Sequence, residues 1–72
     1  MEVVALALTS DVSLMLVNEN DGLGWRFSHW QHRALALIDL QPTVEDRERH
    51  FRDAASAAEY FRTQYGSRLR PR

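Results

Sequence analysis

Uninterrupted apolar runs stand out in the first half of the chain. They are Val3–Leu8, Leu14–Val17 and Ala34–Ile38. A strand with one solvated face alternates apolar and polar residues, because successive side chains point to opposite faces of the sheet. These three runs do not alternate, so we expect strands that need cover on both faces.

Polar turn signals separate the first two predicted strands. The cluster Thr9-Ser10-Asp11 follows residues 2–8, which we predict to be the first strand. Residues 12–18 are predicted to be the second strand. Because leucine and alanine are also good helix formers, a helix over residues 3–17 is the alternative.

A hairpin is predicted after the second strand. The polar segment 18–22 ends in Asp21-Gly22, and this glycine supplies the positive φ angle that a hairpin loop needs. Residues 23–29 then alternate as a third strand. Its predicted faces are Trp25, Phe27 and His29 on one side and Arg26, Ser28 and Trp30 on the other. After a tight connection near residues 30–32, a strand over 33–40 is expected to end before Pro42.

The pattern becomes helical from Thr43 onward. Thr43 is a good N-cap residue, and the acidic Glu45 and Asp46 follow in the first turn, where negative charge is favoured. One apolar stripe then recurs at spacings of three and four, formed by Phe51, Ala54, Ala58, Phe61 and Tyr65. We favour one continuous helix that ends at Gly66. The alternative is a second N-cap at Asp53, with a short helix or a loop over residues 43–52.

Together these elements predict an α+β fold. We expect a small antiparallel meander of three or four strands with one C-terminal helix packed on one face. Residues 1–66 form the single predicted domain, and 67–72 are expected to be a disordered basic tail. The apolar stripe of the helix is expected to pack on the chain's own sheet, with a coiled-coil seam to another chain as the alternative.

The size of the chain gives a reason to expect a partner. A domain of 72 residues has a thin core, and small scaffolds often need a disulfide, a metal or an oligomeric partner. The chain has no cysteine, which excludes a disulfide and a thiolate metal site. One helix covers one face of a sheet, and a second copy of the chain is the simplest cover for the other face. We therefore expect a homodimer, and a different protein partner is left open.

The charge is nearly balanced, with a formal net charge of −1. A field of this size does not draw a protein onto nucleic acid or an anionic membrane. All nine basic residues are arginine, which we attribute to a GC-rich, bacterial source genome. No segment approaches the ~20 apolar residues of a membrane span, and Glu2 replaces the basic start of a signal peptide. A soluble cytoplasmic protein is expected.

Nucleic-acid binding is the second interpretation of the sequence. Aromatic side chains on a strand can stack on unpaired bases, and arginines can contact phosphates. The candidate residues are Trp25, Arg26, Phe27 and Arg33. Aromatic residues on a strand more often belong to the core, and the basic footprint of a nucleic-acid binder is missing, so we rank this function below protein interaction.

Metal binding and catalysis have weaker support. The three histidines, with Asp21 or Glu48 completing a set, have poor spacing for a metal site: His29, His32 and His50. Asp39 interrupts an apolar strand, and burial would raise its pKa, but no histidine or nucleophile motif is near it. We predict no catalytic, metal or cofactor site. The expected function is a non-catalytic interaction or regulatory module that acts as a homodimer, and ligand or metal binding at the dimer interface ranks third.

Overall fold

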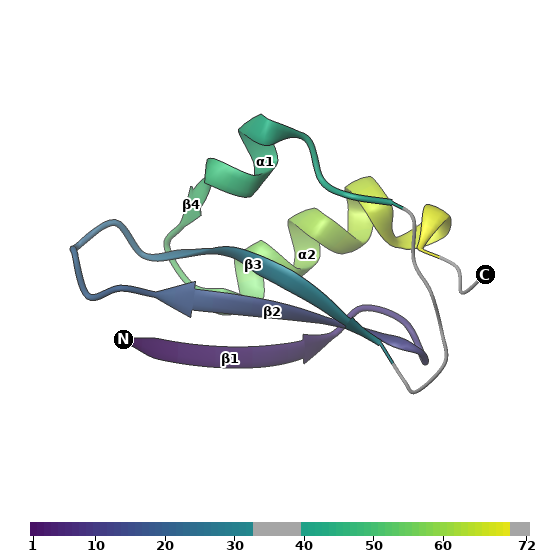
Figure 1. Ribbon diagram of the computed structural model, residues 1–72, viewed down its shortest axis with the longest axis horizontal. Coiled ribbons are helices and arrows are strands. Elements are labelled where there is room, and N and C mark those ends of the chain that lie inside the picture. The colour runs from purple at the N-terminus through teal and green to yellow at the C-terminus, as the bar shows by residue number, and fades with distance from the viewer. Residues whose placement is uncertain (33–39, 70–72) are drawn as a thin grey trace.

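Four strands and two helices make up the part of the chain that the computed structural model describes, residues 1–32 and 40–69 (Figure 1). The strands form one antiparallel sheet in the order β1-β2-β3-β4. They are β1 Glu2–Ala7, β2 Val12–Asn18, β3 Trp25–His32 and β4 His50–Phe51. The helices are α1 Val44–Glu48 and α2 Ala54–Tyr65, followed by a 3-10 turn, η1, over Gly66–Arg68. The predicted α+β fold, an antiparallel sheet with a C-terminal helix, is confirmed.

The first two strands lie where the sequence predicts them. They pair from Glu2 opposite Asn18 to Ala7 opposite Ser13, without a register shift. The alternative of a helix over residues 3–17 is therefore wrong. Residues 33–39 of the strand predicted over 33–40 lie outside the described residues.

A β-bulge in β3 corrects the predicted faces of this strand. Leu16 lies opposite Phe27 and Met15 lies opposite His29, so Ser28 has no counterpart on β2. One extra residue shifts the alternation of side chains by one position. Phe27 and Trp30 therefore belong to the same buried cluster, and their rings meet at 4.8 Å between centroids. β3 also continues through the predicted connection near residues 30–32.

The hairpin between β2 and β3 is confirmed at its turn. Gly22 has a φ of 82°, and the Asp21 carboxylate accepts a hydrogen bond from the Leu23 amide at 3.0 Å. Gly24 also has a positive φ, 96°. A Cβ atom on Gly24 would lie 2.1 Å from the carbonyl oxygen of Phe51 on β4. The close approach of β4 to the start of β3 therefore requires glycine at position 24.

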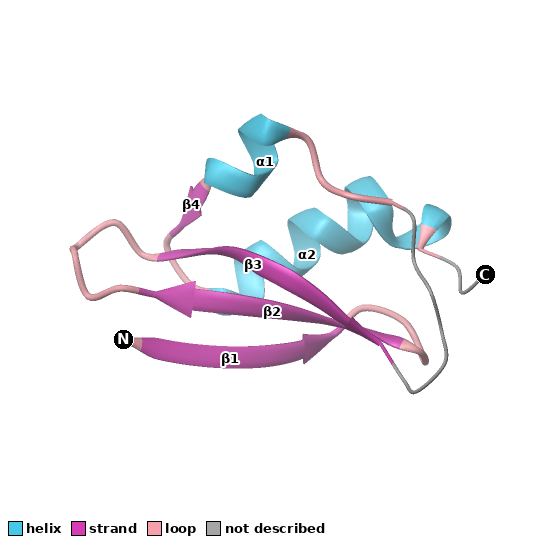
Figure 2. Cartoon of the chain, in the orientation of Figure 1, coloured by secondary structure: helices cyan, strands magenta, loops and turns pink. Residues whose placement is uncertain are grey.

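The helical region is split in two, so the favoured continuous helix is wrong and its alternative is correct (Figure 2). Thr43 caps α1, since its hydroxyl accepts from the Asp46 amide at 3.1 Å. The helix then ends because β4 pairs with the start of β3, Phe51 opposite Trp25. Asp53 caps α2 through the Ser56 amide at 2.8 Å.

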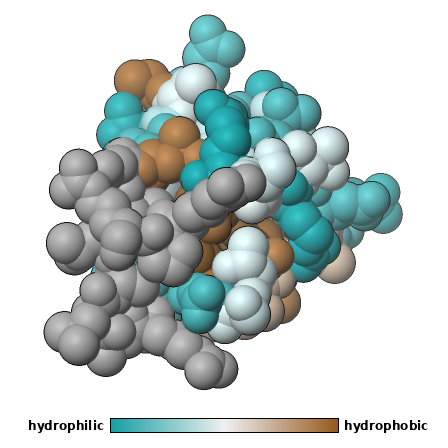
Figure 3. All heavy atoms as spheres, turned by 90° about the vertical axis from the view of Figure 1, so that its right-hand side faces the viewer, coloured by the Kyte–Doolittle hydropathy of each residue, from teal (hydrophilic) through white to brown (hydrophobic). Residues whose placement is uncertain are grey.

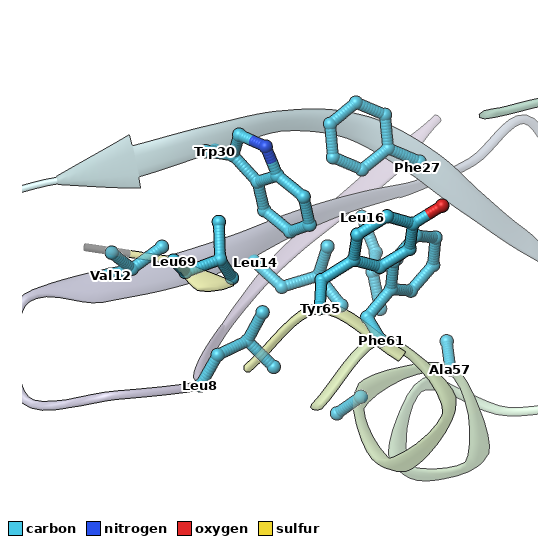
Figure 4. Close-up of a cluster of buried hydrophobic side chains, with 11 residues drawn as sticks. Leu8, Val12, Leu14, Leu16, Phe27, Trp30, Ala57, Phe61, Tyr65 and Leu69 are labelled. Atoms are coloured by element: carbon cyan, nitrogen blue, oxygen red, sulfur yellow. The ribbon is translucent and has the colours of Figure 1, made fainter. Parts of the chain in front are cut away.

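The core lies between α2 and one face of the sheet. Phe61 and Tyr65 point from α2 toward Trp30 and Phe27 on β3 (Figure 4). Side chains of β2 complete this layer, and Leu14, Leu16 and Phe61 are fully buried. The predicted stripe therefore packs on the chain's own sheet.

Residues 66–69 follow α2 as a 3-10 turn and a buried leucine. Leu69 is buried in the core cluster, and its amide donates to the Tyr65 carbonyl at 3.1 Å. Leu69 thus packs on the core of the domain, three residues beyond the predicted boundary at residue 66. Gly66 is the C-cap of α2 with right-handed helical angles, so the chain turns on into η1.

Removal of the Phe61 ring tests the core. The variant Phe61→Ala should lose about 3–5 kcal/mol of unfolding free energy, because a fully buried phenyl ring leaves a cavity. Chemical denaturation measures this loss. Thr63→Ala on the exposed side of α2 is the control and should change little. Native stability of Phe61→Ala would contradict the described core.

The two loop glycines provide a matched pair of substitutions. Gly22→Ala adds a Cβ atom in open space, so it should cost only the strain of a positive φ, about 1–2 kcal/mol. Gly24→Ala adds the same strain and a clash with the Phe51 carbonyl, and it should cost clearly more. Thermal unfolding compares the two variants. Equal losses would show that β4 does not lie against Gly24.

Candidate functional site

The face of the sheet opposite α2 carries uncovered apolar side chains. We call this surface the open face; it consists of Val3, Ala5, Ala7, Ser13, Met15, Val17, Arg26, His29 and Gln31, which are cross-strand neighbours in the register. All described helices lie on the other side of the sheet (Figure 1). Val3 is 56% exposed, and Ala5 and Ala7 are also exposed. The β1 half of the open face is therefore apolar and solvated.

On the central strand of the open face, the side chain of Val17 is shielded from solvent by residues of the neighbouring strands. Val17 is only 6% exposed, yet it is not a member of the core cluster. It lies between Val3 on β1 and Arg26 on β3. Arg26 forms an ion pair with Glu19, and its guanidinium also donates to the Phe27 carbonyl at 3.3 Å. These two contacts hold the Arg26 side chain on the β3 side of the open face, next to Val17 and away from β1.

The predicted nucleic-acid residues are not brought together on one surface. Phe27 is buried under α2, and Trp25 is partly buried against the same cluster. Arg26 lies on the opposite face and is paired with Glu19. Arg33 lies outside the described residues. The ring of Phe27 is therefore not available to stack on a base.

The histidines show no metal site in the described part of the chain. No group of three histidine, aspartate or glutamate side chains there is close enough to hold a metal ion. His29 lies on the open face, where its Nδ1 is 3.0 Å from the Ser28 hydroxyl. His50 lies on β4 at the far edge of the sheet. Asp39 is outside the described residues.

A shallow pocket lies at the end of the sheet where β1 turns into β2. Its volume is about 440 Å³, and it is lined by Ala7, Thr9, Ser10, Asp11, Ser13, Gln31 and His32. The Thr9 hydroxyl accepts from the amides of Asp11 and Val12 and so belongs to the turn. Figure 3 views this end of the molecule, where both hydrophilic and hydrophobic residues reach the visible surface. The polar lining fits small polar molecules and offers no deep apolar cavity.

A buried carboxylate is the feature that the sequence interpretation missed. Asp46 on α1 is 7% exposed, and Tyr60 Oη donates to its Oδ1 at 2.7 Å. Tyr65 Oη donates to Oδ2, and Arg49 Nε lies 3.4 Å from Oδ1. Both oxygens are thus occupied by side chains of the chain itself. This cluster ties α1 to α2 through the hydrogen bonds from Tyr60 and Tyr65.

The electrostatics of this cluster follow from its hydrogen bonds. Burial by itself would raise the pKa of Asp46, but hydrogen bonds from Tyr65, Tyr60 and Arg49 outweigh burial and lower the pKa below its usual value. The same contact with the Asp46 carboxylate raises the pKa of Tyr60. Asp46 therefore stays ionised and Tyr60 stays protonated at neutral pH. Spacing along the chain gave no signal of this arrangement, because the two tyrosines lie 14 and 19 residues beyond Asp46.

Comparison with known proteins adds no family assignment. No protein-family model, curated protein or solved structure matches this chain. Among the described residues, no helix is long and apolar enough to cross a membrane.

Replacement of Asp46 tests the buried cluster and its pH dependence. Asp46→Asn should lower the unfolding free energy at neutral pH by about 1–3 kcal/mol, since hydrogen bonds to a buried carboxylate are lost. A lowered folded-state pKa stabilises the fold above the ordinary value of 3.8, and this stabilisation is lost as the pH falls through the folded-state pKa. The difference between wild type and variant should therefore be constant near neutrality and shrink in acid.

The exposed Glu45 in the same helical turn supplies the control. Glu45→Gln also removes one negative charge but contacts neither tyrosine, so it should change stability little at any pH. Denaturation series between neutral pH and acid measure all three proteins. A loss for Asp46→Asn that stays the same in acid would contradict the ionised, hydrogen-bonded carboxylate.

Proposed function

We propose that this protein is a small, non-catalytic protein-interaction module that acts as a homodimer. The observation that carries the proposal is the open face, whose apolar β1 half is solvated while α2 covers the other side of the sheet. Apolar surface gathered in one place is typical of a protein interface. A domain of this size also gains more from association than a larger one, because its own core is thin.

The described chemistry supports a non-catalytic role. The buried carboxylate of Asp46 accepts hydrogen bonds from Tyr60 and Tyr65 and so joins α1 to α2. The pocket at the β1–β2 turn is shallow, and its Thr9 hydroxyl is engaged in the turn. A catalytic site needs a nucleophile or base with a free position next to a substrate cavity. In these two places, the Asp46 carboxylate and the Thr9 hydroxyl serve the fold.

Molar mass in solution tests this proposal. Sedimentation equilibrium should give about twice the monomer mass of 8.4 kDa at micromolar concentration and a return toward monomer on dilution. Light scattering on the same samples checks the result independently. A mass near 8.4 kDa over the whole concentration range would overturn the proposed homodimer.

A further inference from the structure

The outer edge of β1 is a six-residue strand edge that lacks the usual protection. β1 is the first strand of the sheet and pairs with β2 alone among the described strands. Natural edge strands are blunted by proline, lysine, bulges or covering segments. β1 has no proline and no lysine, and its pairing with β2 contains no bulge. Its single charged residue is Glu2, at the start of the strand.

The direction of the backbone groups of β1 follows from the ladder. The Leu8 amide donates to the Val12 carbonyl at 2.9 Å, so the amide of Leu8 faces β2. Residues of an antiparallel strand alternate between facing the partner strand and facing away. The amides and carbonyls of Val3, Ala5 and Ala7 therefore point away from β2, toward the outer edge. In agreement, the Arg62 guanidinium reaches the Ala7 carbonyl at 2.9 Å.

This edge is complementary to itself. When two copies of β1 run antiparallel with Ala5 opposite Ala5, Val3 of each copy lies opposite Ala7 of the other. All three outward-facing residues then meet outward-facing residues, as a two-fold interface requires. The side chains of Val3, Ala5 and Ala7 are small, and at Ala7 the carbonyl has a second lone pair beside the one that Arg62 uses.

The charges at the two ends of the edge are also complementary. Glu2 lies on the strand face that carries Val4 and Leu6, which is the side of α2. Arg62 lies at the other end of β1, bound to Ala7. In the antiparallel register, Glu2 of one copy comes beside Ala7 and Arg62 of the other copy. Two-fold symmetry produces this opposite-charge contact twice.

We propose that the dimer forms by antiparallel pairing of β1 with β1 of a second copy, which joins the two four-stranded sheets and places Glu2 beside Arg62 of the partner subunit. This inference rests on the homodimer proposed above and specifies its interface. The open faces of the two copies then form one continuous surface, and Val3, Ala5 and Ala7 of each copy lie beside the same residues of the other, which removes part of their apolar surface from water.

A proline at the centre of the edge tests the pairing. Ala5→Pro removes an amide that points away from β2, so the chain keeps its own ladder while the seam loses two hydrogen bonds. The dissociation constant should rise by roughly thirtyfold or more. Met15→Glu is the matched control, since Met15 lies on the open face of β2 and away from the edge. It should remain dimeric, and circular dichroism with a thermal melt checks that both variants fold.

The outcomes separate this inference from the proposed function. A dimeric wild type with a monomeric Ala5→Pro and a dimeric Met15→Glu supports edge pairing. If Ala5→Pro is a folded dimer, edge pairing is overturned but the homodimer stands, and a monomeric Met15→Glu would then place the interface on the open face. A monomeric wild type overturns both.

A charge exchange tests the register even if the proline variant does not fold. Glu2→Arg and Arg62→Glu should each weaken the dimer, by roughly tenfold, because each places like charges together twice. The double variant restores opposite charges and should recover affinity close to that of the wild type. Sedimentation at low salt measures all four proteins. Additive losses in the double variant would overturn the Glu2–Arg62 contact and with it this register.

Discussion

The contact of the Phe61 ring with five other aromatic rings holds the two layers of this protein together. All five ring centroids lie within 5.8 Å of its own, and they belong to Phe27, Trp30, Phe51, Tyr60 and Tyr65. These rings come from β3, β4 and α2, so one side chain connects the bulged strand, the short strand and the helix. All seven aromatic residues of the chain belong to this cluster or pack against it. Concentrating the large side chains on one side leaves small aliphatic groups for the other face.

This unequal division explains why the open face is both apolar and exposed. Val3, Ala5 and Ala7 have small side chains, so covering them would gain little hydrophobic free energy. In this short chain, both described helices lie on the other side of the sheet. Met15 and Val17 add apolar surface beside them on β2. These side chains are apolar, so an association that removes them from water lowers the free energy. The non-alternating runs place apolar side chains on both faces of β1 and β2, and the chain itself covers one of these faces.

The sequence predicted those features that depend on neighbours in the chain. The strands around the β1–β2 turn, the positive φ of Gly22 and the N-caps Thr43 and Asp53 each follow from a few adjacent residues. The bulge at Ser28 does not, because it depends on placing Phe27 and Trp30 together under a helix far along the chain. β4 has only two residues, which is too short for any periodic pattern. The burial of Asp46 likewise depends on tyrosines of another helix. In the sequence, an acidic residue in the first turn of a helix looks the same whether its side chain is exposed or buried.

The two edges of the sheet differ in a way that bears on association. At one edge, β4 is only two residues long, and α1 comes just before it in the chain (Figure 1). The Asp46 cluster fixes α1 to α2 and so keeps this end of the sheet closed. Short and covered edges are the ordinary means by which proteins avoid unwanted strand pairing. β1, at the other edge, is three times as long and regular throughout, and Arg62 reaches it only at Ala7. β3 carries the bulge at Ser28 and pairs with β4 only at Trp25 and Arg26, whereas β1 is regular along its whole length, and pairing through this one edge ends with two copies.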